Sequence, residues 1–247
     1  MTTGVKRYLL FLAACFPLVI ATGAAVTDKH PEFTPLHRNA GIVLGILMLG
    51  LMRGGPLGWI AIAVTALEFI PAGPVFHACL APVLLAIVAL MLTETMLTET
   101  MQPEVAPVPA VPGKLVWVAM AAPPLVLMQI AFGAAYRHKV WNVIPHLAGA
   151  TAVTFLLMLL CMVLLQQRPD IRRAATATLV VVLIQVSLGI ASLTLRLLGL
   201  ESSLWFTIAT VAHVTTGALT LAATVSLGRL VVGNPAAHGE NAGPEQQ

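Results

Sequence analysis

Four histidines stand out in this sequence, because each lies near the start of an apolar run that follows a polar loop. They are His37, His77, His146 and His213. A neutral imidazole is a common metal ligand, and an ionisable side chain within an apolar segment usually has a function. These residues are therefore candidate metal ligands. The simpler alternative is that each one hydrogen-bonds a neighbouring helix or caps a helix end.

Two of these histidines lie in segments that resemble each other. Residues 22–41 and 129–150 both contain Gly-Ala-Ala at the end of an apolar run, then a polar loop, then a histidine that opens the next run. The first glycine precedes the histidine at nearly the same spacing in both segments. Each half of the chain then supplies one further histidine. The predicted pairs are His37 with His77 and His146 with His213.

The composition indicates which elements must position these residues. Of 247 residues, 58% are hydrophobic and only 9% are charged. A soluble domain has about 25% charged residues, so this chain cannot cover a water-facing surface. The apolar runs are continuous rather than alternating, which favours membrane-spanning helices over a barrel. We expect a multi-pass protein in a lipid bilayer.

Other classes of site are disfavoured. The three cysteines, Cys15, Cys79 and Cys161, form no CxxC or CxxCH pattern, so disulfide, zinc and covalent heme sites are not expected. The net charge of +3 comes from a few Lys and Arg residues, mostly in short loops. This is typical of signals that orient a membrane protein and not of nucleic-acid binding.

A spanning helix needs about 20 apolar residues, and this length predicts eight spans. They are Tyr8–Ala25, Leu36–Met52, Pro56–Ile70, Val75–Leu92, Lys114–Ala135, Pro145–Leu165, Ala174–Leu195 and Leu204–Val232. A signal peptide is the alternative for the first. The predicted fold is an all-α integral membrane protein with eight transmembrane helices as two pseudo-repeated four-helix bundles. The predicted domains are an N-terminal half at 1–93, a cytoplasmic linker at 94–113, a C-terminal half at 114–232 and a disordered tail at 233–247.

Loop charges predict the orientation. The loops on one side hold Lys6, Arg7, Arg53, Lys114, Arg168, Arg172, Arg173 and Arg229, and those on the other hold Lys29, Arg38, Arg137, Lys139 and Arg196. The more positive side is expected to be cytoplasmic, with both termini there, in the cytoplasmic (inner) membrane. All four histidines then lie toward the outer ends of parallel helices, two in each half. A helical bundle holds a heme iron between two axial histidines in this way.

Further polar residues could serve such a site. Arg38, Arg137 and Arg196 are candidate partners for heme propionates at the outer side, because arginine binds carboxylates in a bidentate manner; the alternative is contact with lipid headgroups. His138 is a further propionate candidate. Gln129 and Gln185 each precede a glycine by four residues, in QIAFG and QVSLG, and are interpreted as helix–helix hydrogen bonds in preference to cofactor contacts.

Several of these segments resemble the heme A synthase family of cytochrome oxidase assembly proteins. The similar segments are QIAFGAAYRH with the following Pro145-His146 helix, HACLAPVLLAIVALMLT at 77–93, HVTTGALTLAATV at 213–225, and His37-Arg38. The family converts heme O to heme A by oxidising a porphyrin methyl group. The resemblance implies a substrate heme (heme O, product heme A) in the half with His37 and His77, and heme b in the other half. A heme O-making enzyme is an expected partner.

The chain departs from the family at two points. Many members have a cysteine pair in a longer first outer loop, whereas residues 26–36 are short and contain no cysteine. The family usually has a glutamate three residues before the first histidine, where this chain has Thr34; the nearest carboxylate is Glu32, a candidate catalytic residue. Two other functions remain open. One is a diheme b-type electron-transfer subunit of a respiratory membrane complex that does not modify heme. The other is a heme-free assembly factor or transporter with structural histidines.

Overall fold

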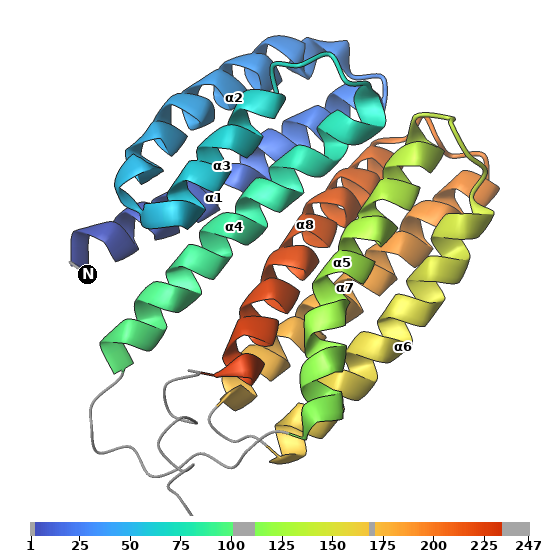
Figure 1. Ribbon diagram of the computed structural model, residues 1–247. Coiled ribbons are helices and arrows are strands. Elements are labelled where there is room, and N and C mark those ends of the chain that lie inside the picture. The colour runs from blue at the N-terminus through green and yellow to red at the C-terminus, as the bar shows by residue number, and fades with distance from the viewer. Residues whose placement is uncertain (1–2, 101–111, 168–170, 234–247) are drawn as a thin grey trace, which may run out of the picture.

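The computed structural model describes residues 3–100, 112–167 and 171–233, and every regular element in these ranges is helical (Figure 1). This confirms the all-α prediction. The eight α-helices are α1 (Thr3–Thr27), α2 (Thr34–Met48), α3 (Gly55–Leu67), α4 (Pro74–Thr100), α5 (Gly113–Arg137), α6 (Ile144–Gln167), α7 (Arg172–Leu197) and α8 (Leu204–Val232). Short 3₁₀ helices, η1 (Pro31–Phe33) and η2 (Leu49–Arg53), flank α2.

Seven of the described helical segments are long and apolar enough to cross a membrane, and α3 is the exception with 13 residues. At 1.5 Å per residue α3 is about 20 Å long, which is less than a typical hydrocarbon core of about 30 Å. Large apolar side chains such as Phe155 and Leu159 are exposed on the outside of the molecule. A lipid bilayer is the environment that these surfaces fit.

Helix α8 occupies the middle of the assembly (Figure 1). It packs against α7, α4, α5 and α1. Its buried positions are mostly alanine, threonine and glycine, among them Ala218, Gly217 and Thr220. Small side chains let helix backbones approach closely where lipid supplies no hydrophobic driving force, so this composition explains the central place of α8.

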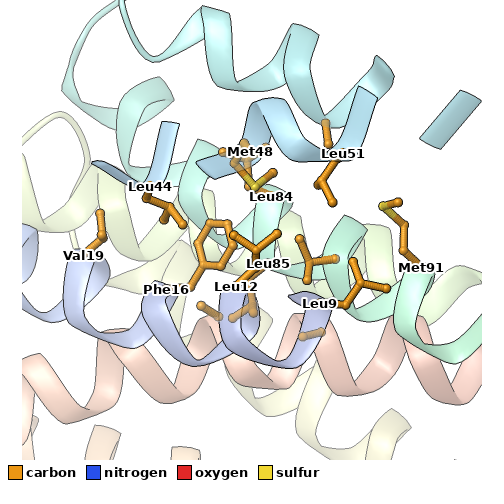
Figure 2. Packing of buried hydrophobic residues seen from close by; sticks show 14 of the residues in the cluster. Leu9, Leu12, Phe16, Val19, Leu44, Met48, Leu51, Leu84, Leu85 and Met91 are labelled. Atoms are coloured by element: carbon orange, nitrogen blue, oxygen red, sulfur yellow. The ribbon is translucent and has the colours of Figure 1, made fainter. Parts of the chain in front are cut away.

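An apolar cluster joins the first helices (Figure 2). Phe16 of α1 is fully buried between Leu44 and Met48 of α2 and Leu84 and Leu85 of α4. A second cluster lies among α5–α8, with Leu157, Leu164 and Val182 at its centre, and also includes Ala86 of α4. These contacts fix the helices that carry the four histidines.

The loops before α2, α4, α6 and α8 gather at one end of the molecule, at the upper right of Figure 1. The loop before α4 contains Gly73 at a φ of +93°, a conformation that suits glycine. Because all four loops share one end, the helix that follows each loop starts at that end. The four predicted histidines therefore lie near the same end of the fold.

The predicted linker at 94–113 is wrong in its first part. Helix α4 continues to Thr100, Thr95 is fully buried, and Glu94 forms an ion pair with Arg229 of α8. The repeated Thr and Glu residues suggested an exposed loop, but the threonine hydroxyls bond to carbonyls one turn earlier and Glu94 has a cationic partner. Residues 101–111 of the linker and 234–247 of the predicted tail lie outside the described residues.

Candidate functional site

The structure brings the four histidines together in the two pairs that the sequence suggested. The ring centroids of His37 on α2 and His77 on α4 are 6.1 Å apart, and the ring planes are nearly perpendicular at 88°. The centroids of His146 on α6 and His213 on α8 are 6.2 Å apart, again at 88°. Two pairs from different helices thus share one geometry.

Three of the histidines donate a hydrogen bond from Nδ1 to an oxygen of the preceding helix or its end. Nδ1 of His37 lies 3.0 Å from the Val19 carbonyl oxygen, Nδ1 of His213 lies 3.1 Å from the Gln185 carbonyl oxygen, and Nδ1 of His77 lies 2.7 Å from Oε2 of Glu68. Such a bond places the proton on Nδ1 and leaves Nε2 with a lone pair. This is the arrangement that metal-binding histidines usually have.

His146 has a different partner, the side-chain amide of Gln129 on α5. Nε2 of Gln129 is 2.8 Å from Nδ1 of His146 and 2.6 Å from the carbonyl oxygen of the same residue. The amide of Gln185 likewise lies beside His213, with its Nε2 3.5 Å from Nε2 of that ring. Both glutamines leave Oε1 buried without a hydrogen-bond partner. Each glutamine side chain lies beside the ring of a histidine on the next helix. The helix–helix hydrogen bonds expected of Gln129 and Gln185 are therefore made to histidines.

A glycine lies against three of the four imidazoles. A Cβ atom built on Gly23 would be 2.7 Å from Cε1 of His37. The same distance is 3.0 Å for Gly133 and His146, and 2.9 Å for Gly189 and His213. In each case the glycine comes one helical turn after the residue that bonds Nδ1. The imidazole therefore rests directly on the backbone of the preceding helix, which is why Gly-Ala-Ala recurs in the sequence.

The fourth histidine, His77, uses a carboxylate in place of this glycine arrangement. Glu68 caps the C-terminus of α3 and reaches His77 across the turn Pro71–Pro74. Glu68 is not among the site residues predicted from the sequence, because it is far from His37 in the chain and no motif links it to His77. The available signal was an acidic residue at the end of an apolar run that otherwise contains no charge.

The first pair is open to the surface beside this turn. Residues 68–74 and His77 line a shallow pocket of about 300 Å³. The His77 side chain is 52% exposed, whereas that of Glu68 is 20% exposed. The residues of the second pair are partly exposed, and a glutamine amide lies against each of their rings. The two pairs thus have the same internal geometry but different access.

The predicted propionate partners differ in their availability. Arg38 is exposed and makes no hydrogen bond or ion pair within the described ranges. Arg137 bonds to Asp28, 2.8 Å away, and to the Ala24 carbonyl oxygen of α1. Arg196 pairs with Glu201 at 2.6 Å, and this bond lowers the pKa of the Glu201 carboxyl. Of the three arginines, Arg38 is the one whose guanidinium has no hydrogen-bond or ion-pair partner among the described residues.

Two residues near this end contribute less. Glu32 bonds to His30, and His30 in turn contacts Thr207 of α8, so Glu32 is placed with that loop contact and not with His37. Burial, followed by the charge of Arg137, lowers the pKa of His138. His138 is therefore neutral at pH 7 and could offer an anion a hydrogen bond but not a charge.

The spacing within each pair fits a single metal ion between the two rings. With metal–nitrogen bonds of about 2 Å, imidazoles on opposite sides of one ion have ring centres roughly 6 Å apart. The described residues contain no group of three or more His, Cys, Asp or Glu side chains that could hold a metal ion. An ion bound by one pair would need its other ligands from outside the protein. A porphyrin supplies four nitrogens in a plane and leaves two axial positions, so the donor set fits heme iron.

Comparisons with models of protein families, with curated proteins and with solved structures found no match. The functional assignment therefore depends on the sequence and on the geometry of the two histidine pairs.

Proposed function

We propose that this protein is a heme-binding membrane oxidoreductase built from two pseudo-repeated four-helix halves. Each half holds one heme iron between its two histidines. The observation that carries this proposal is the shared geometry of the pairs, with centroids 6.1 and 6.2 Å apart and a polar partner at every Nδ1. Four histidines that only bonded neighbouring helices would have no reason to meet in two such pairs.

Within this class, the resemblance favours an activity like that of heme A synthase. The substrate is then heme O, a methyl group of which is oxidised toward the formyl group of heme A. We assign the substrate to the pair His37 and His77, as the resemblance implies, and the 52% exposure of the His77 side chain supports access from outside. We assign heme b, which would supply one-electron transfer, to the pair His146 and His213, as the resemblance implies; a glutamine amide lies against each of these rings.

Charge and location complete this proposal. The histidine end is assigned to the outer side of the cytoplasmic membrane, and both termini to the cytoplasm. Arg38, next to His37 in sequence and free of protein partners in the described part of the chain, would bind a propionate of the substrate. A heme O-making enzyme would supply that substrate.

One observation favours a second function. Thr34 occupies the position where the family has glutamate, and Glu32 bonds to His30 and not to the pair. A diheme electron-transfer subunit of a respiratory complex would need the same histidines but no such carboxylate. In this alternative the protein binds both hemes but does not oxidise a heme methyl group.

Heme analysis of the purified protein tests both. The pyridine hemochrome spectrum should show heme, and its absence would contradict both functions in favour of a heme-free role. Hemes extracted after co-expression with a heme O-making enzyme should include hydroxylated or formyl products. If heme O accumulates in the protein without such products, the electron-transfer alternative replaces the synthase-like activity.

A further inference from the structure

Glu68 distinguishes one of the four histidines from the rest. Nδ1 of His77 faces a carboxylate oxygen at 2.7 Å, whereas Nδ1 of His37 and of His213 face neutral carbonyl oxygens at 3.0 and 3.1 Å. Nδ1 of His146 faces a neutral amide. A full negative charge is thus in contact with a histidine ring in only one of the two pairs.

The position of Glu68 is set by the short third helix. Helix α3 ends at Leu67, and the turn Pro71–Pro74 returns the chain directly into α4 three residues before His77. The Glu68 side chain is mostly covered, and among the described residues His77 is its ion partner. No arginine or lysine in the described part of the chain pairs with this carboxylate, so its charge acts on the histidine pair beside it without neutralisation by a cation.

From this contact we infer that Glu68 is a positioning residue that fixes His77 and lowers the reduction potential of the heme iron in the N-terminal half. The inference rests on the proposed function, because it requires heme iron between His37 and His77. A carboxylate bonded to the outer nitrogen of a ligating histidine raises the basicity of the ligand. Hydrogen bonds to the ligands of a heme iron and nearby charges are established determinants of its reduction potential, and negative charge stabilises the oxidised iron.

The same reasoning predicts an asymmetry between the halves. The iron held by His146 and His213 has neutral groups at both outer nitrogens, so its potential is expected to be the higher of the two. A single side chain, that of Glu68, thus gives the irons held by two similar histidine pairs different reduction potentials. This difference goes beyond heme binding itself, since both pairs could bind heme without it.

Glu68→Gln is the direct test, because glutamine keeps the shape of the side chain and its Oε1 can still accept a hydrogen bond from Nδ1–H, but it has no charge. In the heme-loaded protein, a spectroscopic redox titration should show the lower potential moving upward. The expected change is about tenfold in the ratio of reduced to oxidised iron at a fixed potential, or about 59 mV for a one-electron couple. The higher potential should stay unchanged.

Glu201→Gln is the matched control. It removes a carboxylate from the same end of the molecule, where Glu201 pairs with Arg196 and touches no histidine. Both potentials should be unaffected. An equal rise in the lower potential in this variant would overturn the inference, because it would show a general effect of surface charge.

If Glu68→Gln loses the N-terminal heme, its potential cannot be measured in that variant. Glu68→Asp, which keeps the charge on a shorter side chain, is then the test. Recovery of the heme at its low potential supports the inference, and failure to recover contradicts it. If the wild-type protein binds no heme, the proposed function itself fails. If the wild type binds two hemes and Glu68→Gln shifts neither potential, the inference alone fails.

Discussion

At the scale of single residues, each histidine is held by the preceding helix or its end, and two features of that helix contribute. One is a partner for Nδ1, and the other, for three of the four, is a glycine that lets the ring rest on the backbone. The ring cannot move toward the helix, and Nδ1 cannot rotate away without losing its bond. The position of each ring beside its partner is therefore fixed before any ligand binds, which is the preorganisation that a metal site needs.

Gly189→Ala tests the glycine contact. The new Cβ would be 2.9 Å from Cε1 of His213, so the ring must shift by several tenths of an ångström. We expect weaker heme binding in the C-terminal half and a cost of roughly 1–3 kcal/mol from overpacking. The Soret band and heme content of the purified variant provide the measurement.

Gly113→Ala is the control for this substitution, because a Cβ there would have nothing within 4 Å. Its heme content should equal that of the wild type. Wild-type heme content in Gly189→Ala as well would show that the imidazole does not depend on this contact.

At the scale of elements, the length and continuity of the apolar runs located the helices well, because the backbone polar groups of a segment in lipid must bond to one another. The pairing of His37 with His77 also followed from sequence, since helices that start at the same end bring their first residues together. What the sequence could not show were contacts between distant positions. The sequence predicted Glu94 as a solvated loop residue, but it pairs with Arg229, which is 135 positions away. Glu68 contacts His77 because α3 is short.

The first helix provides a prediction at this scale. Phe16 is fully buried against α2 and α4 (Figure 2), whereas Phe11 on the same helix is 53% exposed. Phe16→Ala should lower the free energy of unfolding by roughly 1–3 kcal/mol, because in lipid the lost packing counts more than the transfer from water. Thermal unfolding in detergent should show a lower midpoint.

The position of Phe16 also predicts which heme is affected. Helix α1 carries Val19, which bonds His37, so disturbed packing of α1 should release the N-terminal heme first. Phe11→Ala should change neither the midpoint nor the heme content. A similar loss of stability in both variants would mean that the α1 core is not the stabilising contact.

At the scale of the whole molecule, the two proposed halves have separate histidine pairs, but their helices pack against one another. Helix α8 belongs to the second half and packs on α1 and α4 of the first. Ion pairs join the halves at both ends, between Asp28 and Arg137 and between Glu94 and Arg229. The pair between Asp28 and Arg137 is mostly buried and leaves Oδ2 of Asp28 and Nε of Arg137 without partners. Because removing two charges from water costs free energy, we expect this pair to fix the relative position of the helices and to add little to the free energy of unfolding.

This organisation predicts that the hemes can be removed one at a time. His213→Ala should abolish the heme of the C-terminal half, because a heme left with His146 alone loses one axial bond. The other pair contacts neither residue, so its heme should remain. Heme per protein should therefore fall to about half, with the lower-potential species retained.

The complementary variant, His77→Ala, should remove the lower-potential species and leave the other. His30→Ala serves as the control, since His30 lies at the same end and contacts Glu32 and Thr207 but neither pair. Its heme content should match the wild type. If His213→Ala and His77→Ala each remove both hemes while the protein stays folded, the two pairs act as one site, and a separate role for each half is wrong.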